Sequence, residues 1–175
     1  VYDVTVQVAD GAGGTDTQAI AVTVTNVNEA PVNSVPGAQT TSQNATLVFS
    51  SANGNAISIA DVDAGAAAVQ VSLTASNGAL TLGGTTGLAF TTGDGSADAT
   101  MTFTGSVANI NAALQGLGFA PTAGYTGSAT LQITTNDQGN SGSGGALADT
   151  DAVTISVTSA SLWVSSVGSA SVPPG

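Results

Sequence analysis

No side chain of this sequence carries a positive charge or a thiol: its 175 residues include no Lys, Arg, His or Cys. Disulfides and ion pairs are therefore unavailable. A fold must be held by apolar burial, by strand pairing and by any cation taken from solution. The Asp and Glu residues give a formal charge of −11 with nothing inside the chain to neutralise it. Nucleic acid and anionic membranes are poor partners for such a chain, and dissolved cations are good ones.

The same absence limits the chemistry. His, Cys and Lys supply most nucleophiles, general bases and soft metal ligands of enzymes. A carboxylate-pair hydrolase stays formally open, for example with Asp61 and Asp63, but a retaining enzyme needs the two carboxyl groups about 5–5.5 Å apart in a substrate cleft. We expect no enzyme. We also expect no membrane insertion, because no apolar run approaches the roughly 20 residues of a membrane helix.

Apolar and polar residues alternate in the first segment of the chain. Val4, Val6 and Val8 share one face, a Gly-rich turn follows at residues 10–14, and alternation resumes with Ile20, Val22 and Val24. This pattern predicts a β-hairpin with one apolar face. An isolated hairpin is marginal in water. We therefore expect this one to close a preceding domain or to pack on another chain.

The same pattern recurs near the C-terminus, which indicates tandem domains with a period of about 130 residues. Aligning Val4 with Leu131 gives an offset of 127, and Asp10 then falls on Asp137. Aligning Ile20 with Val153 gives an offset of 133. The second copy thus carries six more loop residues. We divide the chain into a closing hairpin and linker (1–31), a complete domain (32–159) and a linker or first strand of a following domain (160–175).

The complete domain is predicted to be all-β, an Ig-like antiparallel β-sandwich of seven to nine strands with one short helix. The helix is expected at Ser106–Leu114, crossing between the sheets, with Ser106 as N-cap. Eight strands are predicted: Thr46–Ser50, Ala56–Ala60, Val69–Ser76, Ala79–Leu82, Ala99–Thr104, Leu117–Ala120, Ser128–Asn136 and Ala152–Thr158. The expected core comprises Val69, Val71, Leu73, Leu131, Ile133, Val153, Ile155 and Val157. The tail carries Trp163, read as a domain-junction residue or as an anchor between subunits.

Several segments resemble cadherin-like tandem repeats of large bacterial surface and biofilm adhesins. The first hairpin and the linker Asn26-Val27-Asn28-Glu29-Ala30-Pro31 resemble the end of such a repeat. The segments at residues 111–121 and 124–127 resemble the interior of one. The resemblance covers about residues 1–158 and implies an extracellular protein at the cell surface.

The resemblance also implies calcium at the junction between domains. The matching positions are Asn26, Asn28 and Glu29 in the linker, Asp61 and Asp63 in the next domain, Asp137 closing the penultimate strand, and Asp10 in that role for the preceding domain. Carboxylate, carboxamide and carbonyl oxygens are the ligands that calcium takes. The alternative is that these acids are solvated turn residues, as we read Asp94, Asp98, Asp149 and Asp151.

The leading functional hypothesis is a structural or adhesive repeat of an extracellular adhesin or filament, rigidified by calcium. Its partners would be neighbouring repeats or identical subunits, with a surface glycan or protein as receptor. The alternative is a glycan-binding module of a secreted protein, for which the few aromatic residues are a poor platform. The hairpin itself has two interpretations. It belongs to an upstream domain of a longer chain, or it is donated to a neighbouring subunit by strand addition, which would build a filament.

Overall fold

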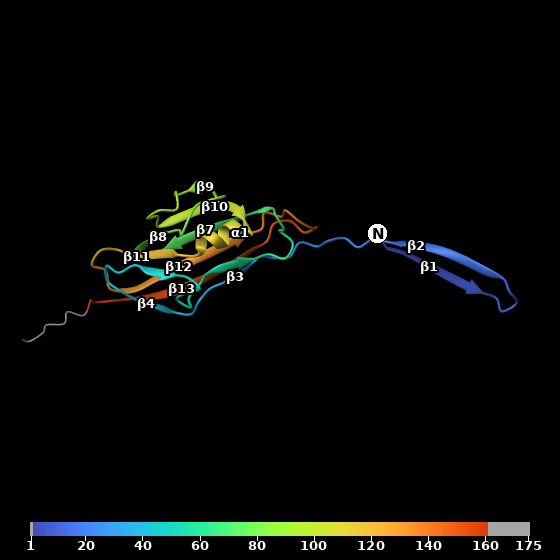
Figure 1. Cartoon of the computed structure of the whole chain (residues 1–175), viewed down its shortest axis with the longest axis horizontal. Helices are drawn as coiled ribbons and strands as arrows, with labels where there is room; N and C mark the ends of the chain where they lie inside the picture. The colour runs from blue at the N-terminus through green and yellow to red at the C-terminus, as the bar shows by residue number, and fades with distance from the viewer. Residues whose placement is uncertain (1, 161–175) are drawn as a thin grey trace, which may run out of the picture.

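The computed structural model describes residues 2–160 as a free β-hairpin joined by a linker to a β-sandwich (Figure 1). The hairpin consists of β1 (Tyr2–Ala9) and β2 (Thr15–Val22). Figure 1 shows it extending away from the sandwich, with its turn at the far end from the linker. The predictions for Trp163 and the remainder of the tail concern residues 161–175, which lie outside the described range.

The sandwich is all-β with one helix among the described residues, as predicted. Its largest sheet has six strands in the order β4-β13-β12-β7-β10-β9, and a three-stranded sheet has the order β5-β11-β8. A further pair, β3-β6, lies beside the entering linker. All pairings are antiparallel except that of β4 with β13. The bounds are β3 (Val32–Ser34), β4 (Gln39–Ser42), β5 (Leu47–Phe49), β6 (Ser58–Ala60), β7 (Ala68–Ala75), β8 (Gly78–Thr81), β9 (Ala89–Thr92), β10 (Thr100–Ser106), β11 (Leu117–Pro121), β12 (Gly127–Asn136) and β13 (Ala148–Thr158).

Alternation along the strands places the core. In β7, β10 and β12 every second side chain is buried, because successive residues of a strand point to opposite faces of the sheet. The eight predicted core residues are all confirmed, with exposures of 0–2%. The aromatic residues Phe49, Phe103 and Phe119 complete the core and are fully buried.

The helix α1 (Val107–Leu114) lies where the sequence predicts it and connects β10 of the large sheet to β11 of the small one. The Ser106 hydroxyl accepts a hydrogen bond from the backbone N–H of Asn109, which satisfies one free donor of the first turn. Ile110, Ala113 and Leu114 face the core. Asn111 faces the pair β3-β6 and bonds both the N–H and the carbonyl of Ile59.

The predicted number of strands was wrong. The sandwich has eleven described strands, β3 to β13, rather than seven to nine. The strands that the sequence did not predict are β3, β4 and β9. They are only three or four residues long, lie at the edges of their sheets and are rich in Asn, Ser, Gln and Thr. Edge pairing holds them by backbone hydrogen bonds, so they need no run of alternating apolar residues.

Two adjacent glycines after β8 provide a test of the packing. A methyl group on Gly83 would collide with the backbone carbonyl of Gln115, whereas one on Gly84 would meet open space. We expect Gly83→Ala to lower the free energy of unfolding by about 1–3 kcal/mol, because a backbone atom cannot turn aside as a side chain can. Gly84→Ala is the control and should leave the denaturation midpoint unchanged. Equal midpoints for both variants would contradict the packing described.

Candidate metal centre at the linker

The linker between hairpin and sandwich is fixed to the loop that joins β12 to β13. The backbone N–H of Asn28 donates to the carbonyl of Ser143 at 3.0 Å, and the N–H of Ser143 donates to the carbonyl of Asn26 at 3.0 Å. Asn26 remains exposed, and its carboxamide lies 3.4 Å from the Ser141 hydroxyl. Asn28 is buried, with 6% of its surface exposed. The linker is therefore part of the sandwich at Asn28.

Asp137 is the centre of this attachment. Its Oδ1 accepts the backbone N–H groups of Gly139 and Leu147, each at 2.8 Å, and its Oδ2 accepts the carboxamide N–H of Asn28 at 2.6 Å. Burial alone would raise the pKa of Asp137, but the hydrogen bonds from Leu147, Gly139 and Asn28 outweigh it and hold the pKa below its ordinary value. Asp137 is thus an ionised, buried acceptor.

Asp61 and Asp63 form a second acidic element directly after β6. The Oδ1 of Asp61 accepts the N–H groups of Asp63 and Ala64 at 3.1 and 3.0 Å, which closes a turn. The Oδ2 of Asp63 accepts the N–H of Glu29 at 3.2 Å. Burial, and then the neighbouring carboxyl of Asp63, raise the pKa of Asp61. Two carboxyl groups in contact with no cationic side chain to balance them favour a bound cation.

Three buried oxygens at this end of the sandwich have no hydrogen-bond donor: Oδ1 of Asn28, Oδ2 of Asp61 and Oδ1 of Asp63. A buried polar oxygen without a partner is costly, and a hard cation satisfies it. The amide orientation of Asn28 is well determined, because its Nδ2 donates both to Asp137 and to the carbonyl of Gly145 at 2.8 Å. The donor set thus fits calcium in type. One cation that took all three oxygens would have half of the smallest usual set, so carbonyls, water or Glu29 would have to complete it.

The seven predicted ligand positions are divided by the structure. Two groups lie where the linker enters the sandwich: Asn28 contacts Asp137, and the backbone N–H of Glu29 contacts Asp63, which neighbours Asp61. Asn26 contacts Ser141 and Ser143 in the loop between β12 and β13 and none of the other predicted ligands. Asp10 lies in the hairpin turn, far from the others (Figure 1). Within residues 2–160, no group of three or more Asp, Glu, His or Cys side chains is arranged to hold a metal ion.

Sequence reasoning missed Asn33 and Asp149 as residues of the linker attachment. The backbone N–H of Asn33 donates to Oδ2 of Asp149 at 2.7 Å, and the Thr135 hydroxyl donates to Oδ1 of Asn33 at 2.6 Å. Asp149 was read as a solvated turn residue. Its role could have been found from the repeat, because Asp16 occupies the same place in the first hairpin.

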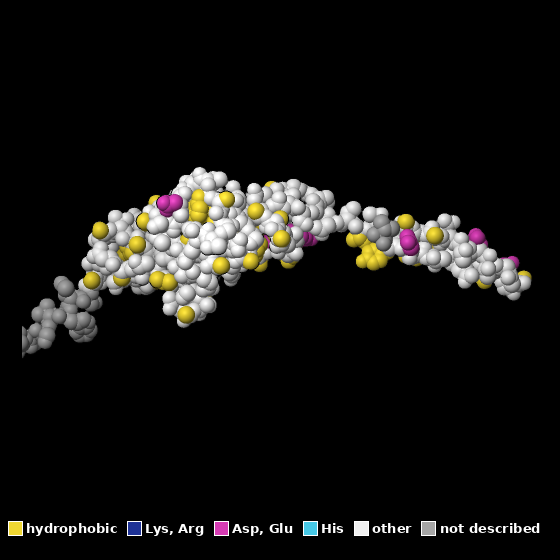
Figure 2. Space-filling view, turned by 45° about the horizontal axis from the view of Figure 1, so that its top comes forward, with side chains coloured by type: hydrophobic (Ala, Val, Ile, Leu, Met, Phe, Trp, Pro, Cys, Tyr) yellow, Lys and Arg dark blue, Asp and Glu magenta, His cyan; other side chains and the backbone are white. Residues whose placement is uncertain are grey.

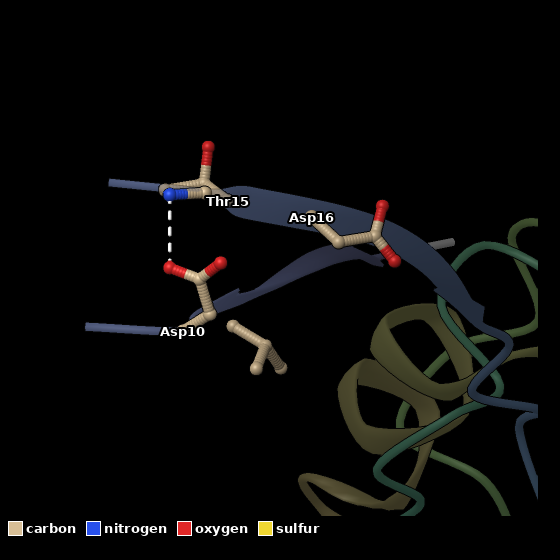
Figure 3. A pocket seen from close by; sticks show the side chains of 5 residues that line it. Asp10, Thr15 and Asp16 are labelled. Carbon is tan, nitrogen blue, oxygen red and sulfur yellow. Dashed lines mark hydrogen bonds between the residues drawn. The ribbon is translucent and has the colours of Figure 1, made fainter. Parts of the chain in front are cut away.

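The paired strands of the two hairpins have the same register. Val4 pairs with Ile20 in β1-β2, and Leu131 pairs with Val153 in β12-β13, as the offsets of 127 and 133 require. The turns also match. The Oδ1 of Asp10 accepts the N–H groups of Ala12 and Gly14, which correspond to Gly139 and Leu147. These two bonds lower the pKa of Asp10. Figure 3 shows the Asp10 turn from close by, with Thr15 and Asp16 on the returning strand.

The sequence has no Lys, Arg or His, and the face in Figure 2 accordingly shows acidic and uncharged side chains alone. No helix among them is long and apolar enough to cross a membrane. Comparison with protein-family models and with curated proteins found no match to this chain.

Proposed function

We propose that this chain is a structural repeat of an extracellular adhesive or filament-forming protein, and that calcium stiffens the junction at which its linker enters the sandwich. The observation that carries the proposal is the equivalence of the two hairpins in strand register and in turn hydrogen bonds. A repeated closing hairpin, followed by a linker that packs on the next sandwich, is the arrangement of a tandem array. Such an array acts as a spacer or adhesive rod and needs no catalytic group.

The calcium part of the proposal rests on the unpartnered oxygens of Asn28, Asp61 and Asp63. The Glu29 N–H already contacts Asp63, and Asn28 contacts Asp137, so the linker bridges the β6 loop and the β12–β13 turn. A cation shared by Asn28 and the Asp pair would neutralise the pair and hold the linker against the sandwich. The resemblance to cadherin-like repeats supports the same assignment.

Calcium is expected to raise the melting temperature of the protein. A ligand at one hundred times its Kd that binds only the folded state adds about 2.7 kcal/mol, which corresponds to several degrees for a domain of this size. The measurement is a thermal melt by circular dichroism in chelator and in millimolar calcium. Asp61→Ala combined with Asp63→Ala should abolish the rise. The Asp61→Asn, Asp63→Asn variant, which keeps the turn acceptor, should abolish most of it.

The matched control removes two carboxylates elsewhere. Asp3→Ala with Asp151→Ala changes the net charge equally, and neither side chain makes a described hydrogen bond. This variant should keep the full calcium response, which separates a specific site from general relief of charge repulsion. Identical melts of the unmodified protein in calcium and in chelator would remove calcium from the proposal.

The structural role is tested on the native material by negative-stain electron microscopy. We expect a rod or filament with repeating units, and an N-terminal sequence and mass of the native polypeptide that show how many repeats it carries. Compact single particles without a repeating unit would contradict a tandem array.

A further inference from the structure

We infer that the hairpin of residues 2–22 is a docking element for one kind of partner: a β-sandwich body equivalent to residues 26–127 that lacks its last two strands. The inference rests on the proposed repeat function and deepens it, because it names the partner, the strand register and the contacts that hold it. It uses none of the calcium oxygens.

The apolar face of the hairpin is the first argument. Val4, Val6 and Ile20 are 45–46% exposed, and yellow apolar side chains are visible on the hairpin surface in Figure 2. Their counterparts Leu131, Ile133 and Val153 are 0–1% exposed, because β12 and β13 lie over the core. The hairpin thus carries the side-chain pattern of a buried pair of strands without the body that would bury it.

The second argument is the strand register. A body without the equivalents of β12 and β13 has open edges on its equivalents of β7 and β4. In the sandwich, β12 pairs with β7 from Leu131↔Ala75 to Asn136↔Gln70, and β13 pairs with β4 from Ile155↔Gln39 to Thr158↔Ser42. The offset of 127 places Thr5 opposite the partner's equivalent of Thr74. In the sandwich of this chain the matching edges of β7 and β4 are already occupied by its own β12 and β13. A second complete copy therefore cannot accept the hairpin unless its own closing hairpin is displaced.

A hollow at the hairpin turn supplies the third argument. It is lined by Val8, Asp10, Gly14, Thr15 and Asp16 (Figure 3). The equivalent positions in the sandwich are Thr135, Asp137, Leu147, Ala148 and Asp149. There the linker fills the place: Asn28 donates to Asp137, and the backbone of Asn33 donates to Asp149. The hairpin hollow accordingly fits a segment that presents an Asn carboxamide to Asp10 and a backbone N–H to Asp16.

The hairpin turn differs in two ways from the turn between β12 and β13. The hairpin turn is six residues shorter, so it lacks the counterparts of Ser143 and Gly145 that bind Asn28 in the sandwich. Val8 replaces Thr135, whose hydroxyl bonds the Asn33 side chain. The docking contacts at the hairpin turn are therefore fewer than in the sandwich, and Val8→Thr should add one.

The test builds the partner onto the full chain. Residues 26–127 are placed directly before Val1, because position 127 corresponds to position 0 of the hairpin and the connection keeps its native length.

The chain has no cysteine, so an introduced pair is unique. Thr5→Cys with Thr74→Cys in the added segment should form a disulfide, since directly opposed residues of antiparallel strands lie within disulfide distance. Gln7→Cys with the same Thr74→Cys is two residues out of register and should not form one. All measurements are made in chelator, so loss of the calcium effect does not alter the result.

Two further measurements decide the outcome. In the extended chain, Asp10→Ala or Asp16→Ala should lower the melting temperature of the added repeat, and Val8→Thr should raise it. No Thr5–Thr74 disulfide, or equal crosslinking from Gln7, would overturn the inference. So would a crosslinked dimer of the unextended chain carrying Thr5→Cys and Thr74→Cys, because that would identify the partner as a second, strand-swapped copy.

Discussion

Removing the Asp137 carboxylate, in the variant Asp137→Ala, is expected to lower the free energy of unfolding by about 3–5 kcal/mol. The change leaves three donors without their acceptor: the N–H groups of Gly139 and Leu147 and the carboxamide of Asn28. Asp137 is only 2% exposed, so water cannot easily replace it. The measurement is urea denaturation in chelator, followed by circular dichroism.

Asp137→Asn tests the charge separately from the shape. The amide keeps one acceptor oxygen but presents an NH2 group where Asn28 needs an acceptor, so a smaller loss is expected. The folded-state pKa of Asp137 lies below its ordinary value of 3.8, and its contribution is therefore present above that pH and lost as the pH falls through the folded pKa. The difference in the free energy of unfolding between the unmodified protein and Asp137→Asn should be constant near neutrality and shrink below about pH 3.8. A difference that does not change with pH would argue against an ionised Asp137.

The matched control is Asp10→Ala. Asp10 makes the same turn bonds in the free hairpin. The hairpin turn lies at the far end from the sandwich and does not contact it. The unfolding transition of the sandwich should therefore be unchanged. A comparable loss from Asp10→Ala would show that the hairpin supports the sandwich.

Leu131→Ala is expected to lower the free energy of unfolding by about 2–5 kcal/mol, because it opens a cavity in the fully buried centre of β12. Val4→Ala is the equivalent truncation in the hairpin, where the side chain is 46% exposed, and should change the denaturation midpoint little. The same Val4→Ala change should become costly in the extended chain, where the hairpin has a body to cover it. Similar costs for Leu131→Ala and Val4→Ala in the unextended chain would mean that the hairpin face is already buried.

The closing hairpin, the helix and the main core strands could be predicted because their residues carry strong local patterns. Leu131, Ile133 and Ile155 alternate with polar residues, and Ser106 begins a run with helical spacing. The edge strands β3 and β4 could not be predicted, since they are held by backbone pairing with strands that do not follow them in the chain. β9 pairs with the next strand, β10, but is only four residues long and shows no alternation of apolar and polar residues. Local propensity contains no information about such partners.

The candidate site was predictable in its residue types but not in its connections. The turn acids Asp61, Asp63 and Asp137 and the linker residue Asn28 were predicted from the resemblance to cadherin-like repeats, whose linker and Asp-x-Asp positions they match. The carboxamide N–H of Asn28 donates to Asp137, and its Oδ1 is left without a donor. This arrangement depends on two segments 109 residues apart in the chain. The contact of Asn33 with Asp149 is of the same kind and was missed.

The sequence by itself determined that the chain is all-β, that its hairpin is repeated with offsets of 127 and 133, and that no cationic side chain offsets its carboxylates. These properties follow from periodicity and composition, which are local. Only the tertiary structure decided which copy of the hairpin is buried, which carboxylate oxygens are satisfied and which are left without a donor. The physical reason is that burial and hydrogen-bond satisfaction depend on the neighbours that a segment acquires on folding, and the similar alternating patterns at Val4 and Leu131 acquire different ones.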